Sequence, residues 1–418
     1  MAKKSDLRCG MCGKYDSAAS PVIPVIEDLY LCTDCIKFID DQRDTELRRR
    51  HSKTTTKKEE AKTIPTPHQI KEFLDQYVIG QDEAKKYLSV AVYNHYKRIN
   101  HPQSQDDDDV DIEKSNVVLV GPTGTGKTLL AKSIAKLLNV PFTIVDATVL
   151  TEAGYVGEDI ESLLTRLLQA CDYDVEKAEQ GIIFIDEIDK IARKSDNPSI
   201  TRDVSGEGVQ QGLLKLLEGT VALVPPQGGR KHPEQKMIPV NTKNILFICG
   251  GAFDGIERKI AARLNTHIVG YGHDEKSRKR QRDNLMRYVM PQDLKSFGMI
   301  PEIIGRLPIL TSLDPLDKPA LRRILTEPKN AIIRQYTAMM EIDGVKLVFT
   351  EDALDTIVDK AVEYKLGARG LRSIVETVMV DAMFDAPSLK DQTFTVDAEY
   401  VNRQLNKAHF GEILKVNG

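Results

Sequence analysis

The chain has 418 residues and a formal net charge of −4, which suits two or three globular domains and argues against a protein built to coat nucleic acid. No run approaches the roughly 18 consecutive apolar residues of a membrane span, and no apolar run resembling a signal peptide precedes Cys9. We therefore expect a cytoplasmic protein whose partners are neither nucleic acids nor membranes.

Residues 1–42 are predicted to form a small zinc-binding domain. They contain two C-x-x-C pairs with the spacing of a four-thiolate zinc site: Cys9, Cys12, Cys32 and Cys35. So small a module has little apolar mass, so the metal would supply its folding energy. A redox dithiol is the alternative, which the presence of two pairs weakens. Residues 43–63 are charged and Thr-rich, cannot bury a core, and are predicted to be a flexible linker.

Residues 64–314 alternate between short apolar runs and amphipathic helical patterns. The apolar runs are Val117–Val120, Phe142–Val145, Ile182–Ile185 and Ile245–Cys249. Runs this short and this apolar suit parallel strands that helices cover on both faces. We therefore predict an α/β domain in which a parallel sheet is flanked by helices.

Helical periodicity dominates after Asp314 and predicts a small, mainly helical domain over residues 315–418. The periodic pattern runs first from Leu316 to Met340. A short strand is expected at Lys346–Phe349, and two further helices are expected after it.

A phosphate-binding loop is predicted at Gly121–Thr128, which fits G-x-x-x-x-G-K-[ST] between a strand and a helix. Its glycines let backbone N–H groups surround phosphates at the positive end of a helix. Lys127 is expected to neutralise the β- and γ-phosphates of ATP, and Thr128 to hold Mg²⁺. The predicted nucleotide-binding residues of this segment are Pro122, Thr123, Gly124, Thr125, Gly126, Lys127, Thr128 and Leu129.

Two carboxylates, Asp186 and Glu187, follow an apolar run and are expected at the carboxyl edge of the sheet, where ligands bind. Asp186 is predicted to contact Mg²⁺, and Glu187 to polarise the attacking water as general base. An acid pair at a helix N-terminus is the alternative, which the phosphate loop upstream disfavours. The sequence has neither G-x-S-x-G nor H-E-x-x-H, so we expect an ATP hydrolase with no peptidase site of its own.

Three further features are ambiguous from their spacing alone. Gly154–Gly157, which contains Tyr155 and Val156, is either a tight loop or a functional one. The basic residues 230–232 are either a solvated surface cluster or a binding site. Arg306 directly follows Gly305, and Arg369 lies two residues after Gly367, each near a segment boundary. A nucleotide enzyme needs arginines near phosphate, but spacing does not say which ones serve.

Together these motifs resemble the ClpX family, the AAA+ protein-unfolding ATPases that feed the ClpP peptidase. The resemblance covers nearly the whole chain and includes Tyr77–Gln81, Ile185–Asp189, Pro301–Arg306 and Gly367–Arg372. It implies an AAA+ P-loop core, a homohexameric ring, and tagged or unfolded protein substrates and adaptors as partners. It also implies ATP, Mg²⁺ and Zn²⁺ as ligands and ClpP as a partner.

The resemblance also assigns roles around the nucleotide. Val78 and Ile79 would line the adenine pocket. Arg306 would act as a catalytic arginine finger on the nucleotide of the neighbouring subunit, and Arg369 would sense nucleotide from the small domain.

Further roles implied by the resemblance concern polypeptides. Tyr155 and Val156 would grip a substrate in the axial pore, with a second pore loop near Ser199–Ser205. The positive pore entrance, which favours the carboxylate end of a tag, would be Arg230, Lys231 and His232. The peptidase-docking loop, Ile-Gly-Phe in the family, reads Val269, Gly270 and Tyr271 in this chain. The aliphatic-Gly-aromatic pattern is kept, although the tyrosine hydroxyl must find a partner or stay hydrated.

Two other classes of protein remain as alternatives. A nucleic-acid motor could use the zinc module to read DNA, but the acidic charge balance and the lack of a basic-aromatic platform count against it. A nucleotide-gated scaffold that does not hydrolyse ATP is disfavoured because Lys127, Asp186 and Glu187 are all present.

Overall fold

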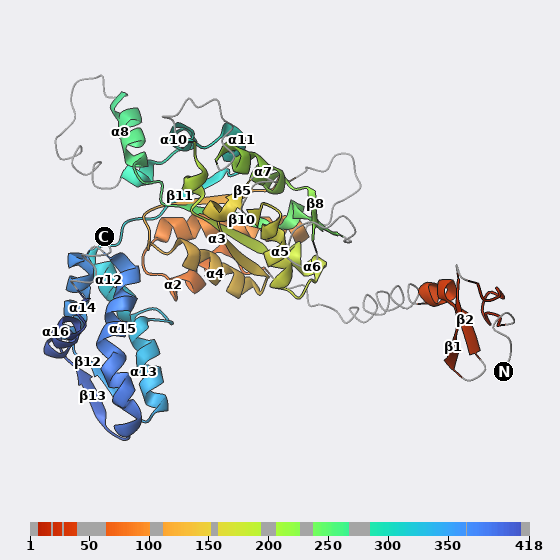
Figure 1. Cartoon of the computed structure of the whole chain (residues 1–418). Coiled ribbons are helices and arrows are strands. Elements are labelled where there is room, and N and C mark those ends of the chain that lie inside the picture. The colour runs from red at the N-terminus through yellow and green to blue at the C-terminus, as the bar shows by residue number, and fades with distance from the viewer. Residues whose placement is uncertain are drawn as a thin grey trace. The chain divides into compact units, whose positions relative to one another are not determined.

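The computed structural model describes residues 7–17, 20–26, 29–39, 64–100, 112–151, 158–193, 206–225, 237–266, 285–364 and 366–410. The chain divides into two compact units, Met1–Thr63 and Ile64–Gly418. Figure 1 draws the first unit in red and the second from orange to blue. None of the helices in the described ranges combines the length and the apolar character needed to cross a lipid bilayer.

The N-terminal unit contains an antiparallel hairpin of β1 (Val22–Ile26) and β2 (Leu29–Cys32), followed by helical residues 33–39. Its described core consists of three cysteines and two aliphatic side chains: Cys9, Cys32, Cys35, Val22 and Leu31. Because most of this core is thiol, apolar burial alone offers the unit little stability.

A five-stranded parallel sheet with the order β11-β3-β10-β7-β4 forms the centre of the second unit (Figure 1). The strands are β3 (Val117–Val120), β4 (Phe142–Asp146), β7 (Ile182–Asp186), β10 (Leu246–Gly251) and β11 (Ile309–Ser312). All four predicted apolar runs are therefore confirmed as strands. The fifth strand, β11, was not predicted because half of it is Thr and Ser, as an edge strand tolerates.

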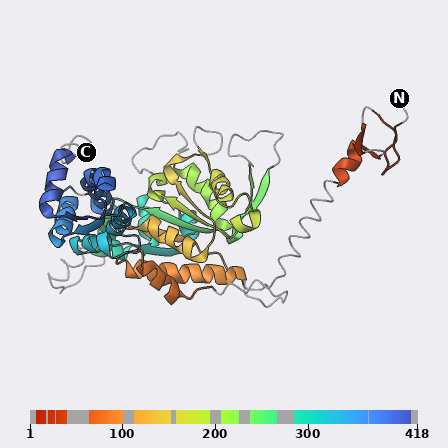
Figure 2. The ribbon, with the colours of Figure 1, turned by 90° about the horizontal axis from the view of Figure 1, so that it is seen from below.

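Helices cover both faces of this sheet. Successive side chains of a strand point to opposite faces, so Val117 and Leu119 pack in one core cluster while Val118 and Val120 pack in the other. The first face carries α2 (Pro67–Asp75), α3 (Asp82–Asn100) and α4 (Lys127–Leu138). Figure 2 shows orange α2 and α3 running along that side. The second carries α5 (Ser162–Gln169), α7 (Glu207–Glu218), α8 (Ile256–Thr266), α10 (Pro291–Phe297) and α11 (Pro301–Gly305).

Shorter elements complete the part of the chain before Asp314. The strands are β5 (Leu150–Thr151), β6 (Glu158–Asp159), β8 (Val221–Val224) and β9 (Ile238–Asn241). The helical turns are η1 (Ala147–Val149), α6 (Val175–Ala178), η2 (Ile188–Ile191), η3 (Thr242–Asn244) and η4 (Leu285–Tyr288).

The C-terminal part, blue in Figure 1, has its own core, whose buried members lie between Leu321 and Leu405. Its helices are α12 (Lys318–Thr326), α13 (Ile332–Ile342), α14 (Glu351–Glu363), α15 (Gly367–Asp385), η5 (Ala386–Ser388) and α16 (Ala398–Lys407). Strands β12 (Lys346–Phe349) and β13 (Thr393–Val396) pair in parallel. The predicted helical run from Leu316 to Met340 is two helices, because Pro328 interrupts it. The predicted fold class, a parallel sheet flanked by helices with a helical C-terminal domain, is confirmed.

Candidate active site and metal centre

The predicted phosphate loop and acidic pair meet at one edge of the sheet. The loop follows β3, and Asp186 is the last residue of β7. The register aligns the end of β3 with Gly251, the last residue of β10, and Cys249 of β10 with Ile185 of β7. The strands are parallel, so these ends share the carboxyl edge, where α/β sheets bind ligands.

Glycine is required inside the loop for its backbone conformation. Gly124 and Gly126 have φ of +84° and +102°, values that residues with a side chain rarely adopt. Gly126 is the N-cap of α4, so the unpaired N–H groups of the first turn of that helix face the loop. This arrangement suits a bound anion.

Lys127 lies inside the loop with 8% of its surface exposed. Its Nζ donates to the carbonyl oxygens of Gly121 at 2.5 Å and Pro122 at 3.0 Å. Burial lowers the pKa of the ammonium below its ordinary value, although the charges of Asp186 and Asp189 oppose this shift. A buried cation whose hydrogen bonds go to neutral carbonyls gains from an anion at the same place, so the loop fits a phosphate.

Asp186 connects the loop to the acidic pair. Its Oδ2 accepts a hydrogen bond from Thr128 Oγ1 at 3.2 Å, and its Oδ1 accepts one from the backbone N–H of Glu187 at 3.0 Å. A hydroxyl and a carboxylate side by side are oxygen ligands of the kind that Mg²⁺ prefers. The residues present therefore fit the cation that the phosphate loop implies.

Glu187 has a left-handed backbone, with φ of +56°, and its side chain is exposed. Such a conformation costs a non-glycine residue about 1–3 kcal/mol and clusters at functional sites. The reversal turns Glu187 away from the direction of β7.

The residues predicted for the adenine pocket line a cavity of about 330 Å³. Val78 and Ile79 are 5% and 7% exposed, and Val78 Cγ1 lies 3.6 Å from where a Cβ on Gly126 would stand. The cavity is lined from both sides of residue 314 by Asp75, Val78, Ile79, Gly80, Asp82, Lys85, Arg323 and Glu327. Lys85 is nearly fully buried and donates to the Val78 carbonyl at 2.6 Å, which holds this turn in place.

Arg369 lies in the first turn of α15, beside the phosphate loop. A Cβ on Gly124 would be 3.8 Å from the backbone N of Ala368 and 4.0 Å from that of Arg369. The start of α15 therefore approaches the loop closely, while the side chain of Arg369 is exposed.

Arg306 is not brought to this site. Its carbonyl oxygen accepts a hydrogen bond from Asn116 Nδ2 at 2.9 Å, and Asn116 directly precedes β3. The phosphate loop follows the other end of the strand, so about 13 Å of extended chain separates the two positions. A role for Arg306 at this chain's own nucleotide is thereby disfavoured.

A residue that sequence reasoning missed is Gln81. Its side-chain amide donates to Asp314 O and accepts from Asp314 N, both at 2.8 Å. These two hydrogen bonds join the residue before α3 to the segment that leads into the C-terminal domain. The motif Tyr77–Gln81 marked Gln81 as noteworthy, but no pattern in the sequence pointed to Asp314.

Several predicted residues lie outside the described ranges, and their roles stay predictions: Tyr155, Val156, Ser199–Ser205, Arg230, Lys231, His232, Val269, Gly270 and Tyr271.

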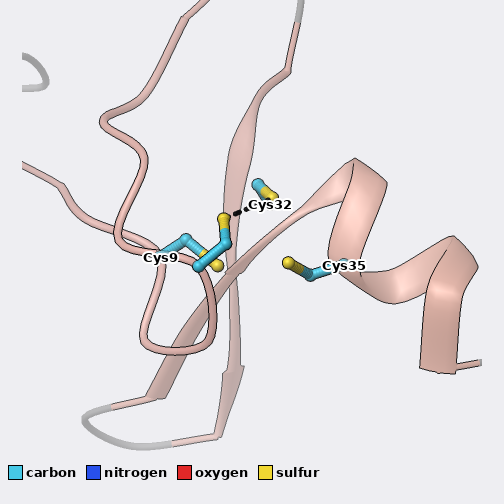
Figure 3. A group of neighbouring side chains, drawn as sticks. Cys9, Cys32 and Cys35 are labelled. Carbon is cyan, nitrogen blue, oxygen red and sulfur yellow. Dashed lines mark hydrogen bonds between the residues drawn. The ribbon is translucent and has the colours of Figure 1, made fainter.

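In the N-terminal unit the four predicted ligands come together. Each offers a sulfur, and the four Sγ atoms lie within 4.8 Å of one another. A tetrahedral zinc with Zn–S bonds of about 2.3 Å places its sulfurs about 3.8 Å apart, and Cys12 Sγ lies 3.5 Å from Cys32 Sγ. Figure 3 shows the thiols of Cys9, Cys32 and Cys35 directed toward a common centre. The cluster therefore fits a zinc ion.

A phosphate loop after β3, carboxylates at the end of β7 and a helical C-terminal part define a P-loop ATPase of the AAA+ class. Family models agree: one described as AAA domain (Cdc48 subfamily) matches residues 112–310, and one described as C-terminal, D2-small domain, of ClpB protein matches residues 316–397. The chain is also similar to curated relatives called ATP-dependent Clp protease ATP-binding subunit ClpX. It is 63% identical to that of Bacteroides thetaiotaomicron over 410 residues, 98% of both chains. The chain belongs to the ClpX family, and it is an ATP hydrolase.

Other relatives agree. The chain is 63% identical to a relative of the same name from Bacteroides fragilis over 412 residues, 99% of both chains. It is 64% identical to that of Porphyromonas gingivalis over 408 residues, 97% of this chain and 98% of the relative. The AAA domain implies a nucleotide and Mg²⁺ as ligands of the active site.

Proposed function

We propose that the protein unfolds tagged proteins at the expense of ATP and passes them through the axial pore of a homohexamer into the ClpP peptidase. The observation that carries this proposal is the nucleotide cavity, which residues before and after Asp314 line together. A nucleotide whose base lies in this cavity would contact both domains, so its hydrolysis would change the contacts between them, which is what a mechanical enzyme requires. The printed names of the relatives, subunits of a Clp protease, support the same function.

The chemistry follows from the residues of the site. Lys127 holds the β- and γ-phosphates, and Thr128 and Asp186 hold the cation. Mg²⁺ held by these two residues would neutralise negative charge that develops on the phosphate. Glu187 takes a proton from the water that attacks the γ-phosphorus. An arginine from the neighbouring subunit, Arg306, stabilises the charge of the transition state.

Motion follows from the contacts across the domain junction. The start of α15 and Arg369 lie beside the phosphate loop, so loss of the γ-phosphate removes a contact of the small domain. Gln81 and its two hydrogen bonds to Asp314 keep the junction together while the domains rotate. The clustered thiols of the N-terminal unit suit a reducing cytoplasm, where we infer that the protein works.

The polypeptide is handled by loops whose roles come from the family resemblance. Tyr155 and Val156 grip the substrate, and the basic residues Arg230, Lys231 and His232 attract the carboxylate of its tag. Val269, Gly270 and Tyr271 dock the ring on the peptidase. The four cysteines of the N-terminal unit would hold zinc, which would supply the folding energy of this unit.

Degradation of a stable, C-terminally tagged protein tests the function. With ATP and the cognate peptidase we expect degradation, and without the peptidase we expect unfolding with no cleaved peptide bond. Tyr155→Ala is expected to slow degradation about tenfold per ATP hydrolysed, because the ring that transmits force is lost. Tyr173→Ala, at an exposed position in the same domain, serves as the control. Equal degradation per ATP by the Tyr155→Ala and unmodified proteins would exclude a role for Tyr155 in gripping the substrate.

A mixing experiment tests the assignment of Arg306 to a neighbouring site. Arg306→Ala and Lys127→Ala are each expected to lower kcat for ATP by about 10³-fold or more. In a random mixed ring, about a quarter of the interfaces combine an intact phosphate loop with an intact arginine. Mixed subunits are therefore expected to regain up to that fraction of the activity. Recovery is measured after exchange of subunits, and its complete absence in assembled mixed rings would contradict action between subunits.

A further inference from the structure

We propose that Glu218 is a positioning residue for the predicted arginine finger: it holds the guanidinium of Arg306 so that it is directed at the neighbouring subunit's nucleotide. The inference rests on the proposed role of Arg306. Glu218 Oε1 accepts from Arg306 Nε at 3.2 Å and from Nη2 at 3.1 Å. Among the described residues, the hydrogen bonds of this guanidinium all go to Glu218.

The ion pair with Glu218 uses one edge of the Arg306 guanidinium. Arginine offers five N–H donors in a rigid plane, and Glu218 engages the Nε and Nη2 side. The Nη1 side is left for a second anion, such as a phosphate across the subunit boundary. A carboxylate on one edge therefore sets the plane and direction of the opposite edge.

The backbone that carries Glu218 is firmly held. Glu218 is the last residue of α7, and Gly219 ends the helix with φ of +98°. Two carbonyls of the last turn accept hydrogen bonds from side chains: Leu216 O from Lys114 Nζ at 3.3 Å, and Leu217 O from Asn116 Nδ2 at 3.2 Å. The end of α7 is thus anchored to the segment that leads into β3.

The same buried amide holds the backbone of Arg306. Asn116 is 1% exposed, and its Nδ2 also donates to Arg306 O at 2.9 Å. The Asn116 side chain therefore joins Leu217, the residue before Glu218, to Arg306. Glu218 and Arg306 themselves lie 88 positions apart in the sequence. The ion pair and the amide together determine where the guanidinium lies.

The ion pair itself is solvent-exposed: the side chains of Arg306 and Glu218 are 47% and 40% exposed. Exposed pairs add little to the stability of a fold. Losing the pair should therefore leave folding unchanged and affect catalysis, because a catalytic group held in advance in its working geometry lowers the barrier.

Steady-state ATP hydrolysis by the full-length assembled protein tests the inference. Glu218→Gln is expected to lower kcat about tenfold, part of the roughly 10³-fold effect of an arginine finger, with KM for ATP changed less than about twofold. Glu218→Asp, which keeps the charge on a shorter stem, should lie between. In the Arg306→Ala background, Glu218→Gln should cause no further loss. Glu363→Gln, which removes a helix-surface pair with Lys360, is the matched control.

Each outcome is decisive when urea midpoints and sedimentation show that all variants fold and assemble alike. A normal or raised kcat for Glu218→Gln, beside a deficient Arg306→Ala, overturns the positioning role and leaves the proposed function intact. An equal loss in both backgrounds shows that Glu218 acts elsewhere. If Arg306→Ala keeps full activity, the assignment of Arg306 and this inference both fail.

Discussion

Glu187→Gln is expected to abolish turnover of ATP while preserving its binding. The change removes the general base and keeps the length and shape of the side chain, so kcat should fall by about 10²–10⁴-fold. Lys127, Thr128 and Asp186 remain to hold nucleotide and cation, so the affinity for ATP should change little. Hydrolysis is measured at saturating ATP, and binding is measured by calorimetry on the same preparation.

Glutamine is the right replacement because of the backbone at this position. Residue 187 has φ of +56°, and Glu and Gln bear that conformation at similar cost, so a loss of activity does not arise from a collapsed turn. Glu176→Gln, in the first turn of α6, is a matched control. A variant at position 187 that retained more than about a tenth of kcat would remove Glu187 from the role of base.

What the sequence could predict was local. The phosphate loop is one continuous segment, and the pattern of its glycines and lysine is enough to predict its conformation. The four cysteines lie in two short pairs. Strands β3 and β7 were evident because both of their faces are covered, which demands an unbroken apolar run. The edge strand β11 does not need an unbroken apolar run. Because Thr311 and Ser312 form half of it, the apolar pattern did not predict it.

Contacts between distant segments could not be predicted in the same way. Gln81 meets Asp314 across 233 positions, and Glu218 meets Arg306 across 88. No periodic pattern in the sequence marks either contact, because only the folded chain brings the segments together. The position of Arg306 at the opposite end of β3 from the phosphate loop follows from the sheet topology, which no single motif contains.

Removal of zinc is expected to unfold the N-terminal unit and to leave the ATPase part folded. The described core of this unit holds only two aliphatic side chains, Val22 and Leu31, beside its cysteines. Burial of an aliphatic side chain contributes about 1.5–3 kcal/mol, whereas a structural zinc in a small module supplies about 10–16 kcal/mol. The second unit has separate cores, so its stability does not depend on the metal.

Cys32→Ser provides the measurement, because Cys32 is fully buried in the cluster. Bound zinc should fall from about one per chain to none. Amide hydrogen exchange should lose its protection in the described residues of the N-terminal unit, while the strands of the five-stranded sheet keep theirs. Basal ATP hydrolysis should stay near its normal rate. Cys171 packs beside the core of the large domain, outside the zinc cluster, so the Cys171→Ser protein should keep the zinc of its N-terminal unit. Retention of both metal and protection by Cys32→Ser would mean that apolar burial, and not the ion, holds the module together.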